Sequence, residues 1–147
     1  MNAFEILIND HRAVEKLFEK IGNSGKSALK TRERLFEKLR EELELHTQVE
    51  ERIFYPEIQK LPGAKELVPD ALEEHAEVKQ MLRQIAKLSP DQHEWSDRIE
   101  ELKQAVQHHV KDEEHEMFPA AREEMDEQRA EDLGRRIRQM KKQKASA

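Results

Sequence analysis

The chain has 147 residues, of which 36% are hydrophobic and 39% are charged, and its formal net charge is -6. This length fits a single domain with a buried core. The modest negative charge gives no reason to expect DNA or RNA binding, because nucleic-acid binders normally carry a broad basic face. Cysteine is absent from the sequence, which excludes disulfides, zinc-thiolate sites and iron-sulfur clusters, so any metal must be held by nitrogen and oxygen.

The first half of the chain predicts two long helices, because its apolar residues recur at helical spacing. Asn2 and Glu5 can form a capping box at the start of the first helix. Glycine residues between positions 22 and 25 end that helix, and the second pattern runs from about residue 27 to Pro56. We expect Pro56 to kink or end the second helix, since proline cannot donate a backbone hydrogen bond.

The second half predicts two more helices. The third carries an apolar stripe from Leu67 to Leu88, and the fourth is expected to start at Ser89 and Pro90, an N-cap residue and a proline suited to the first helical position. The whole pattern predicts an all-α, up-and-down antiparallel four-helix bundle. No run of residues is long and apolar enough to span a membrane, and the amino terminus lacks a signal-like segment, so we expect a cytoplasmic protein without membrane partners.

A fifth, shorter helical pattern follows the bundle. We divide the chain into a metal-binding bundle, residues 1–126, and a short amphipathic, basic C-terminal helix or tail, residues 127–147. Leu133, Ile137 and Met140 form an apolar stripe along this segment. The favoured interpretation is a short helix that packs against the end of the bundle, and the alternative is a basic tail that binds an acidic partner or a membrane surface.

One element occurs twice and is the most informative feature of the sequence. It consists of a histidine and a glutamate four residues apart, and each copy is preceded by a further histidine about 35 residues upstream. The residues of the first half are His11, His46 and Glu50, and those of the second half are His75, His109 and Glu113. The apolar residues repeat with the same shift of 63 or 64 positions. This repetition indicates a duplicated helical hairpin, whose two halves would bring the six residues to the same height in the bundle.

The spacing within each copy suits a metal site. Residues four apart on a helix differ by roughly 40 degrees of rotation and about 6 Å of rise, so both side chains can reach one ion. A single such pair occurs easily by chance on a charged helix surface. Two inward-facing pairs, each with a further inward histidine, indicate a metal, because burying these groups unpaired would cost roughly 1 to 3 kcal/mol each. Four imidazoles and two carboxylates fit a dinuclear iron or manganese centre that keeps a coordination position open for a small molecule.

Two other metal-binding patterns are absent. The ferritin-like di-iron proteins carry Glu-x-x-His on two helices, but no histidine of this chain has a glutamate three residues before it. The zinc-protease pattern His-Glu-x-x-His is also missing, since neither His93-Glu94 nor His115-Glu116 is followed by a second histidine at the required position.

From about residue 4 to residue 119, the chain resembles the hemerythrin-like, or HHE cation-binding, domains. Both copies of the repeat share the Glu-Glu pair and the aromatic-Pro end typical of this family, at Glu50-Glu51 with Tyr55-Pro56 and at Glu113-Glu114 with Phe118-Pro119. The resemblance implies a non-haem di-iron centre with a solvent-derived bridge, with manganese or zinc as alternative metals. It further implies that His11 and His46 ligate one iron, that His75 and His109 ligate the other, and that Glu50 and Glu113 bridge both.

The resemblance is to bacterial members rather than to animal oxygen carriers, which place a further histidine one turn after His75, where this chain has Lys79. It implies binding of O2 or NO for sensing, storage or detoxification. A redox enzyme acting on peroxide or NO is one alternative. Iron-centre repair is another, although the 147 residues lack the separate cysteine-containing domain that such proteins often carry. Metal storage or delivery, or a role as an interaction module, is a third; the sequence assigns no catalytic residue.

Several polar residues near the repeat remain as candidates. His108 is expected at the rim, because it lies about 100 degrees around the helix from His109. Glu51, Glu114 and Glu74 could hydrogen-bond to the ligand imidazoles, with exposed charge as the equal alternative. Tyr55 is interpreted as a packing residue at a helix end, with donation to a bound oxygen species or a role in electron transfer as the alternatives.

Overall fold

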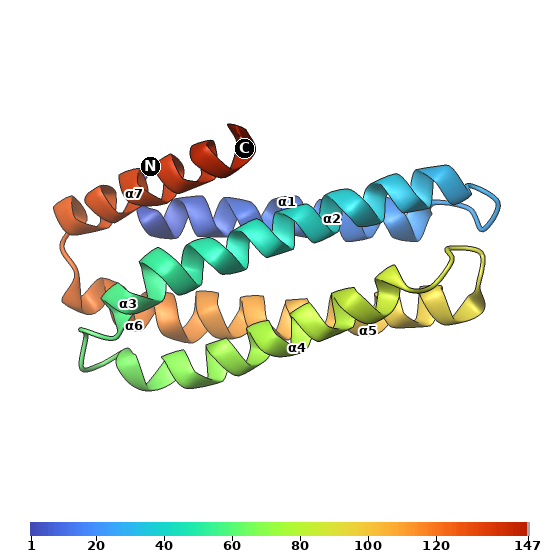
Figure 1. Ribbon diagram of the computed structural model, residues 1–147. Helices are drawn as coiled ribbons and strands as arrows, with labels where there is room; N and C mark the ends of the chain where they lie inside the picture. Colours follow the sequence, from blue (N-terminus) through green and yellow to red (C-terminus); the bar gives the residue numbers. More distant parts are fainter. Residues whose placement is uncertain (147) are drawn as a thin grey trace.

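The computed structural model describes residues 1–146, and no strand occurs among them. Four long helices form the body: α1 Ala3–Asn23, α2 Leu29–Val49, α4 Val68–Ala86 and α5 His93–Asp112. They run up and down, with the α1–α2 hairpin lying over the α4–α5 hairpin (Figure 1). The predicted all-α antiparallel bundle is confirmed. None of the described helices has both the length and the apolar character needed to cross a bilayer.

The helix starts agree only in part with the sequence predictions. At α1 the capping box is present, since Asn2 Oδ1 accepts from the Glu5 backbone amide and Glu5 Oε1 accepts from the Asn2 amide, both at 2.9 Å. The predicted start of the fourth helix at Ser89 is wrong, because α5 begins only at His93. Residues 89–92 form a turn instead, in which the Gln92 amide donates to the Ser89 carbonyl and the Ser89 amide donates to Gln92 Oε1.

Glu50 and Glu113, the two glutamates of the repeat, each open one turn of π-helix. Residues Glu50–Phe54 follow α2, and residues Glu113–Met117 follow α5. In both turns a backbone amide donates to the carbonyl five residues earlier, from Tyr55 to Glu50 and from Phe118 to Glu113. Pro56 and Pro119 each come two residues after a π turn. A proline ring clashes with the regular α-helical hydrogen-bond pattern, and at both positions the π turn has already interrupted that pattern.

The chain therefore continues past both prolines. Helix α3, Tyr55–Ile58, contains Pro56, and helix α6, Phe118–Glu124, contains Pro119. The sequence predicts that Pro56 kinks or ends the second helix; the regular α-helix gives way to the π turn before the proline, and the helical segment ends two residues after it, at Ile58. A short 3-10 turn, Lys65–Leu67, then leads into α4.

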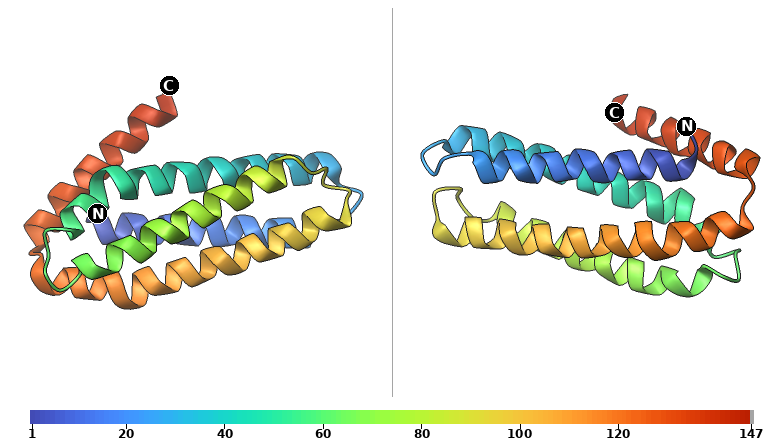
Figure 2. Two further views of the ribbon diagram at one scale, coloured as in Figure 1. Left: turned by 60° about the horizontal axis from the view of Figure 1, so that its bottom comes forward. Right: turned by 180° about the vertical axis from the view of Figure 1, so that it is seen from behind.

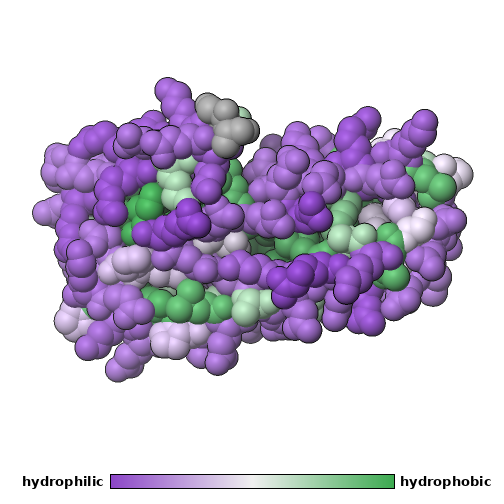
Figure 3. Space-filling model, viewed as in Figure 1, coloured by the Kyte–Doolittle hydropathy of each residue, from purple (hydrophilic) through white to green (hydrophobic). Residues whose placement is uncertain are grey.

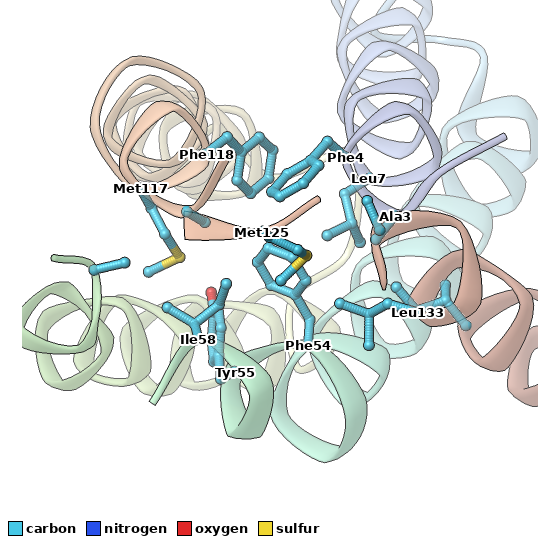
Figure 4. Close-up of a cluster of buried hydrophobic side chains, with 14 of the residues drawn as sticks. Ala3, Phe4, Leu7, Phe54, Tyr55, Ile58, Met117, Phe118, Met125 and Leu133 are labelled. Carbon is cyan, nitrogen blue, oxygen red and sulfur yellow. The ribbon is translucent and has the colours of Figure 1, made fainter. Parts of the chain in front are cut away.

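Two apolar clusters fill the interior at opposite ends of the bundle. The first contains three aromatic rings in edge contact, with centroid distances of 5.8 Å for Phe4–Phe54 and 5.5 Å for Phe4–Phe118 and Phe54–Phe118 (Figure 4). The second lies toward the α1–α2 and α4–α5 turns. Along α1, Leu7 belongs to the first cluster and Val14 to the second, while His11 lies between them. The histidine layer is thus closed by apolar side chains above and below.

The C-terminal segment forms helix α7, Glu127–Ser146, and residue 147 lies outside the described residues. It packs across α1 and α2 at an angle to the bundle (Figures 1 and 2). Leu133 and Ile137 are buried in the first cluster. The backbone comes so close to the amino terminus that a Cβ atom at Gly134 would lie 2.6 Å from the Met1 carbonyl oxygen. The packed helix agrees with the favoured interpretation of this segment.

The outer surface is mostly hydrophilic, and hydrophobic residues show mainly in the hollows between helices on the face in Figure 3. Among the residues that the structure describes, the exposed large hydrophobic side chains are Met1 and Leu72.

Candidate metal centre

The structure brings together all six residues that the sequence singles out. The histidines come from the four long helices, His11 from α1, His46 from α2, His75 from α4 and His109 from α5, and the glutamates open the two π turns. None of the six residues is more than 6% exposed. They form two overlapping groups of four, one with His11 and His46 and the other with His75 and His109, and both groups include Glu50 and Glu113.

Each glutamate lies between imidazoles of both hairpins. Glu50 Oε1 is 3.1 Å from His46 Nε2 of its own hairpin and 2.9 Å from His75 Nε2 of the other. Glu113 Oε1 is 3.4 Å from His109 Nε2 and 3.1 Å from His11 Nε2. One oxygen of each glutamate therefore contacts imidazoles of both hairpins, so each carboxylate lies within reach of both groups of donors.

The other ring nitrogen of every histidine in this cluster contacts a carboxylate. Across the hairpins, His11 Nδ1 is 2.7 Å from Glu114 Oε2, and His75 Nδ1 is 2.7 Å from Glu51 Oε2. Glu51 and Glu114 therefore lie against the ligand imidazoles, as one of the two sequence interpretations proposed.

Within each hairpin the support comes from the residue that directly precedes the first histidine. Asp10 Oδ2 is 2.9 Å from His46 Nδ1, and Glu74 Oε1 is 2.7 Å from His109 Nδ1. Sequence reasoning missed Asp10. A signal was available, because Asp10 and Glu74 are related by the same shift of 64 positions that relates His11 to His75.

These contacts fix which nitrogen of each ring faces the centre. An ionised carboxylate only accepts hydrogen bonds, so each Nδ1 donates a proton to its carboxylate, and Nε2 is the nitrogen that each ring turns inward. Nε2 of His75 and of His109 are only 3.2 Å apart. Within residues 1–146, two of the three buried side-chain polar atoms that lack a hydrogen bond are His46 Nε2 and Glu50 Oε2. These nitrogen and oxygen donors, two of them without a hydrogen-bond partner, fit first-row metal ions.

The charges of the cluster lead to the same conclusion. Burial by itself lowers the pKa of His46, but the charge of Glu50 and the hydrogen bond to Asp10 outweigh it and raise this pKa to about 10. For His109, burial is likewise outweighed by the charges of Glu113 and Glu50 and by hydrogen bonds to Glu50 and Glu74, which raise the pKa to about 11. Burial and the charge of Glu50 raise the pKa of Glu113. The cluster thus stabilises positive charge at its centre.

Tyr55 reaches the middle of the cluster. Its hydroxyl donates to Glu113 Oε2 at 2.6 Å and lies 3.2 Å from Glu50 Oε1 and 3.1 Å from His75 Nε2. Burial, with the charges of Glu50 and Glu113, raises the pKa of Tyr55 well above its usual value, so the phenol keeps its proton. Tyr55 packs in the first apolar cluster, as interpreted from the sequence, but its hydroxyl also contacts the histidine and glutamate cluster, which the packing interpretation did not include. The repeat could not show this contact, because the corresponding residue of the second half, Phe118, has no hydroxyl group; its ring stacks on His11 and packs against Phe4 and Phe54.

A small cavity of about 20 Å³ adjoins the histidines on the side of the second cluster. It is lined by all four imidazoles and by Thr47, and its remaining walls are the apolar side chains of Val14, Leu43, Val78, Val106 and Val110. A volume of this order holds about one water-sized molecule.

A different opening, a cleft of about 40 Å³, lies between α4 and the second π turn. Its walls carry the carboxylates of Asp70, Glu74, Asp112 and Glu116, and it reaches Glu113. His108 is 68% exposed and lies 3.4 Å from Glu74 Oε2, so it is at the rim, as predicted.

Lys79 occupies a position that the sequence comparison had singled out. Its ammonium group donates to Glu51 Oε2 at 2.9 Å. It therefore supports the carboxylate that holds His75.

Known proteins resemble this chain in sequence and in fold. Residues 2–121 match the hemerythrin HHE cation-binding domain family. A DNA nickase of Nostoc sp. (strain PCC 7120) is 30% identical over 131 residues, which are 89% of this chain but only 36% of the nickase. The crystal structure of a hemerythrin HHE cation-binding domain-containing protein from Mycobacterium kansasii superimposes with a TM-score of 0.87 at 26% identity, over 99% of this chain and 89% of that one.

Proposed function

The chain belongs to the hemerythrin HHE cation-binding domain family, and we propose that it holds two iron ions and binds O2 or NO beside them. In this proposal His11 and His46 ligate one ion, His75 and His109 ligate the other, and Glu50 and Glu113 bridge both. The overlapping groups of four donors support the assignment, because both groups contain the same two carboxylates. Imidazole with carboxylate is a donor set that suits iron.

The small cavity carries the proposal for the ligand. Its walls are mostly apolar, its volume is about 20 Å³, and all four proposed ligand histidines border it. An uncharged diatomic molecule fits this space, whereas an organic substrate of several heavy atoms does not. Bound ferrous iron would supply the electrons that such ligands need for tight binding.

The protein's own residues would then tune this chemistry. The valines and Leu43 exclude bulk water from the cavity side, and four carboxylates hold the imidazoles in fixed orientations. Tyr55 holds a proton on the Glu113 side. A rigid, partly dry pocket of this kind favours reversible binding over hydrolysis or ligand exchange with solvent.

The test is reconstitution of the metal-free protein with ferrous iron under anaerobic conditions. We expect about two iron ions per chain and a change in the visible spectrum on addition of O2 or NO. Bound iron without any ligand-dependent spectral change would refute the proposal and favour metal storage or delivery.

Tyr55 supports a second candidate, a redox enzyme that acts on peroxide or NO. A phenol that keeps its proton beside both bridging carboxylates could supply that proton to a reduced substrate. Peroxide turnover by the iron-loaded protein should then exceed that of free iron, and Tyr55→Phe should lower it with iron content unchanged. Turnover equal to that of free iron would rule this candidate out.

DNA cleavage is not part of the proposal. The chain corresponds to 36% of the Nostoc nickase, and its net charge of -6 does not favour contact with phosphates.

A further inference from the structure

Helix α7 reaches the histidine cluster through one lysine. Lys141 Nζ donates to Asp10 Oδ1, and the other oxygen of the same carboxylate lies 2.9 Å from His46 Nδ1. Asp10 is 9% exposed, so its charge is largely removed from solvent. A residue close to the end of the chain thus lies two hydrogen bonds away from a proposed metal ligand.

The lysine is held in place by a well-packed part of α7. Ile137, one turn earlier on the same helix, is 0% exposed. The backbone at Gly134 lies against the amino terminus, and Asn2 Nδ2 donates to Glu127 Oε1 at 3.1 Å. The position of Lys141 therefore follows from the packing of the helix and not only from its own side chain.

The other carboxylates that support imidazoles have different partners. Lys79 donates to Glu51 at 2.9 Å, and Arg12 donates to Glu114 at 2.6 Å, so these two cations come from the bundle itself. Lys141 comes from outside residues 2–121, the part of the chain that matches the family. Helix α7 therefore supplies a cation to Asp10, as the bundle itself supplies cations to Glu51 and Glu114.

The fourth carboxylate, Glu74, shows what Asp10 would lack without Lys141. Glu74 holds His109 as Asp10 holds His46, but its second oxygen lies 3.4 Å from the exposed His108, and Asp112 is a further carboxylate in the same group. The two halves of the cluster are therefore similar in their ligands and different in the charges behind them.

Metal binding makes this cation more important. A His46 ring that ligates a metal through Nε2 is neutral, so the buried charge of Asp10 is then balanced by Lys141. A buried carboxylate without a cation is costly, and it would turn toward solvent. It would then no longer hold the His46 ring in its ligating orientation, which is the function of such supporting carboxylates.

We propose that Lys141 is a positioning residue for metal binding, which acts through Asp10 on His46 and so favours the ion at His11 and His46. The proposal rests on the dinuclear centre proposed above. It makes α7 a working part of the metal site, although the helix contributes no ligand.

The first experiment is an anaerobic titration of the metal-free, full-length protein with Co²⁺, followed by its visible absorption. We expect the wild type to bind two equivalents, and Lys141→Met to bind one of them about tenfold more weakly. Lys141→Arg should restore the affinity. Lys144→Met, three residues further along α7, is the matched control and should behave as the wild type. A wild type that does not take up two Co²⁺ would refute the dinuclear centre, whereas two normal binding steps in Lys141→Met would refute the role of Lys141.

The second experiment separates action through Asp10 from general loosening of α7. In a double-mutant cycle, Lys141→Met should weaken Co²⁺ binding in the wild type and have almost no further effect in an Asp10→Asn background. Equal weakening in both backgrounds would overturn the proposal. In the Co²⁺-loaded wild type, the Nδ1 proton of His46 should give a hyperfine-shifted, exchangeable NMR signal. Lys141→Met should shift or broaden this signal, and an unchanged signal would likewise overturn the proposal.

Discussion

Replacing Val106 with isoleucine would add one carbon atom to the wall of the cavity beside the histidines. The cavity measures about 20 Å³, so a single methyl group takes up most of the space that a diatomic ligand would occupy. Val106 is buried and is not one of the proposed ligands. Metal content should therefore remain at the wild-type level, while the affinity for NO falls.

The size of the effect follows from the packing. To enter, the ligand must push the added methyl group into a filled core, and overpacking of this kind costs about 1 to 3 kcal/mol. The affinity for NO should fall by roughly 5- to 150-fold. The measurement is an anaerobic spectrophotometric titration of the ferrous protein with NO, together with iron analysis of the same sample.

The matched control is Val68→Ile. Val68 is equally buried but belongs to the first apolar cluster, so this change should leave the affinity for NO unaltered. If Val106→Ile bound NO as tightly as the wild type, the cavity could not be the ligand site. If it lost iron and NO binding together, the separation of ligand cavity from metal site would be wrong.

Three further predictions concern the metal cluster and α7. Glu50→Ala should remove most bound metal, whereas Glu51→Ala should weaken binding only about 10- to 100-fold; equal losses by elemental analysis would contradict the bridging role. The raised pKa values of His46 and His109 keep both imidazoles protonated at neutral pH. Metal binding should therefore release protons and become tighter as pH rises. Calorimetry in buffers of different ionisation enthalpy measures the number of protons released, and a value of zero would contradict the prediction. In Gly134→Ala the new Cβ atom would meet the Met1 carbonyl, so this change should destabilise the protein by about 1 to 3 kcal/mol. In Gly22→Ala the new Cβ atom has nothing within 4 Å, so this change should stabilise the protein by about 0.5 to 1 kcal/mol. Thermal unfolding measures both effects.

The bundle and the convergence of the six residues of the repeat could be predicted because both depend on periodicity. Helical spacing placed each histidine on the apolar face of its helix. The repeat of the hairpin then placed the histidines of the two halves at the same height in the bundle. Asp10 escaped notice because the two halves carry different residue types there, aspartate and glutamate. Only the alignment of the halves shows that these positions correspond.

Other features depend on contacts that no local pattern encodes. The hydrogen bond between Lys141 and Asp10 joins residues 131 positions apart, and the role of Tyr55 depends on a side chain of the other hairpin. The π turns before Pro56 and Pro119 could not be predicted either, because sequence rules treat a proline as the end or a kink of a helix. In each case the contact or backbone geometry depends on how distant parts of the chain pack together.

The crosswise support of the histidines links cation retention to assembly of the chain. Glu51 of the first hairpin holds His75 of the second, and Glu114 of the second holds His11 of the first. Neither hairpin alone contains a complete set of oriented donors, so a tight site exists only after the two have docked. Loss of bound metal during denaturation would then report the moment at which the hairpins separate, even while each remains helical.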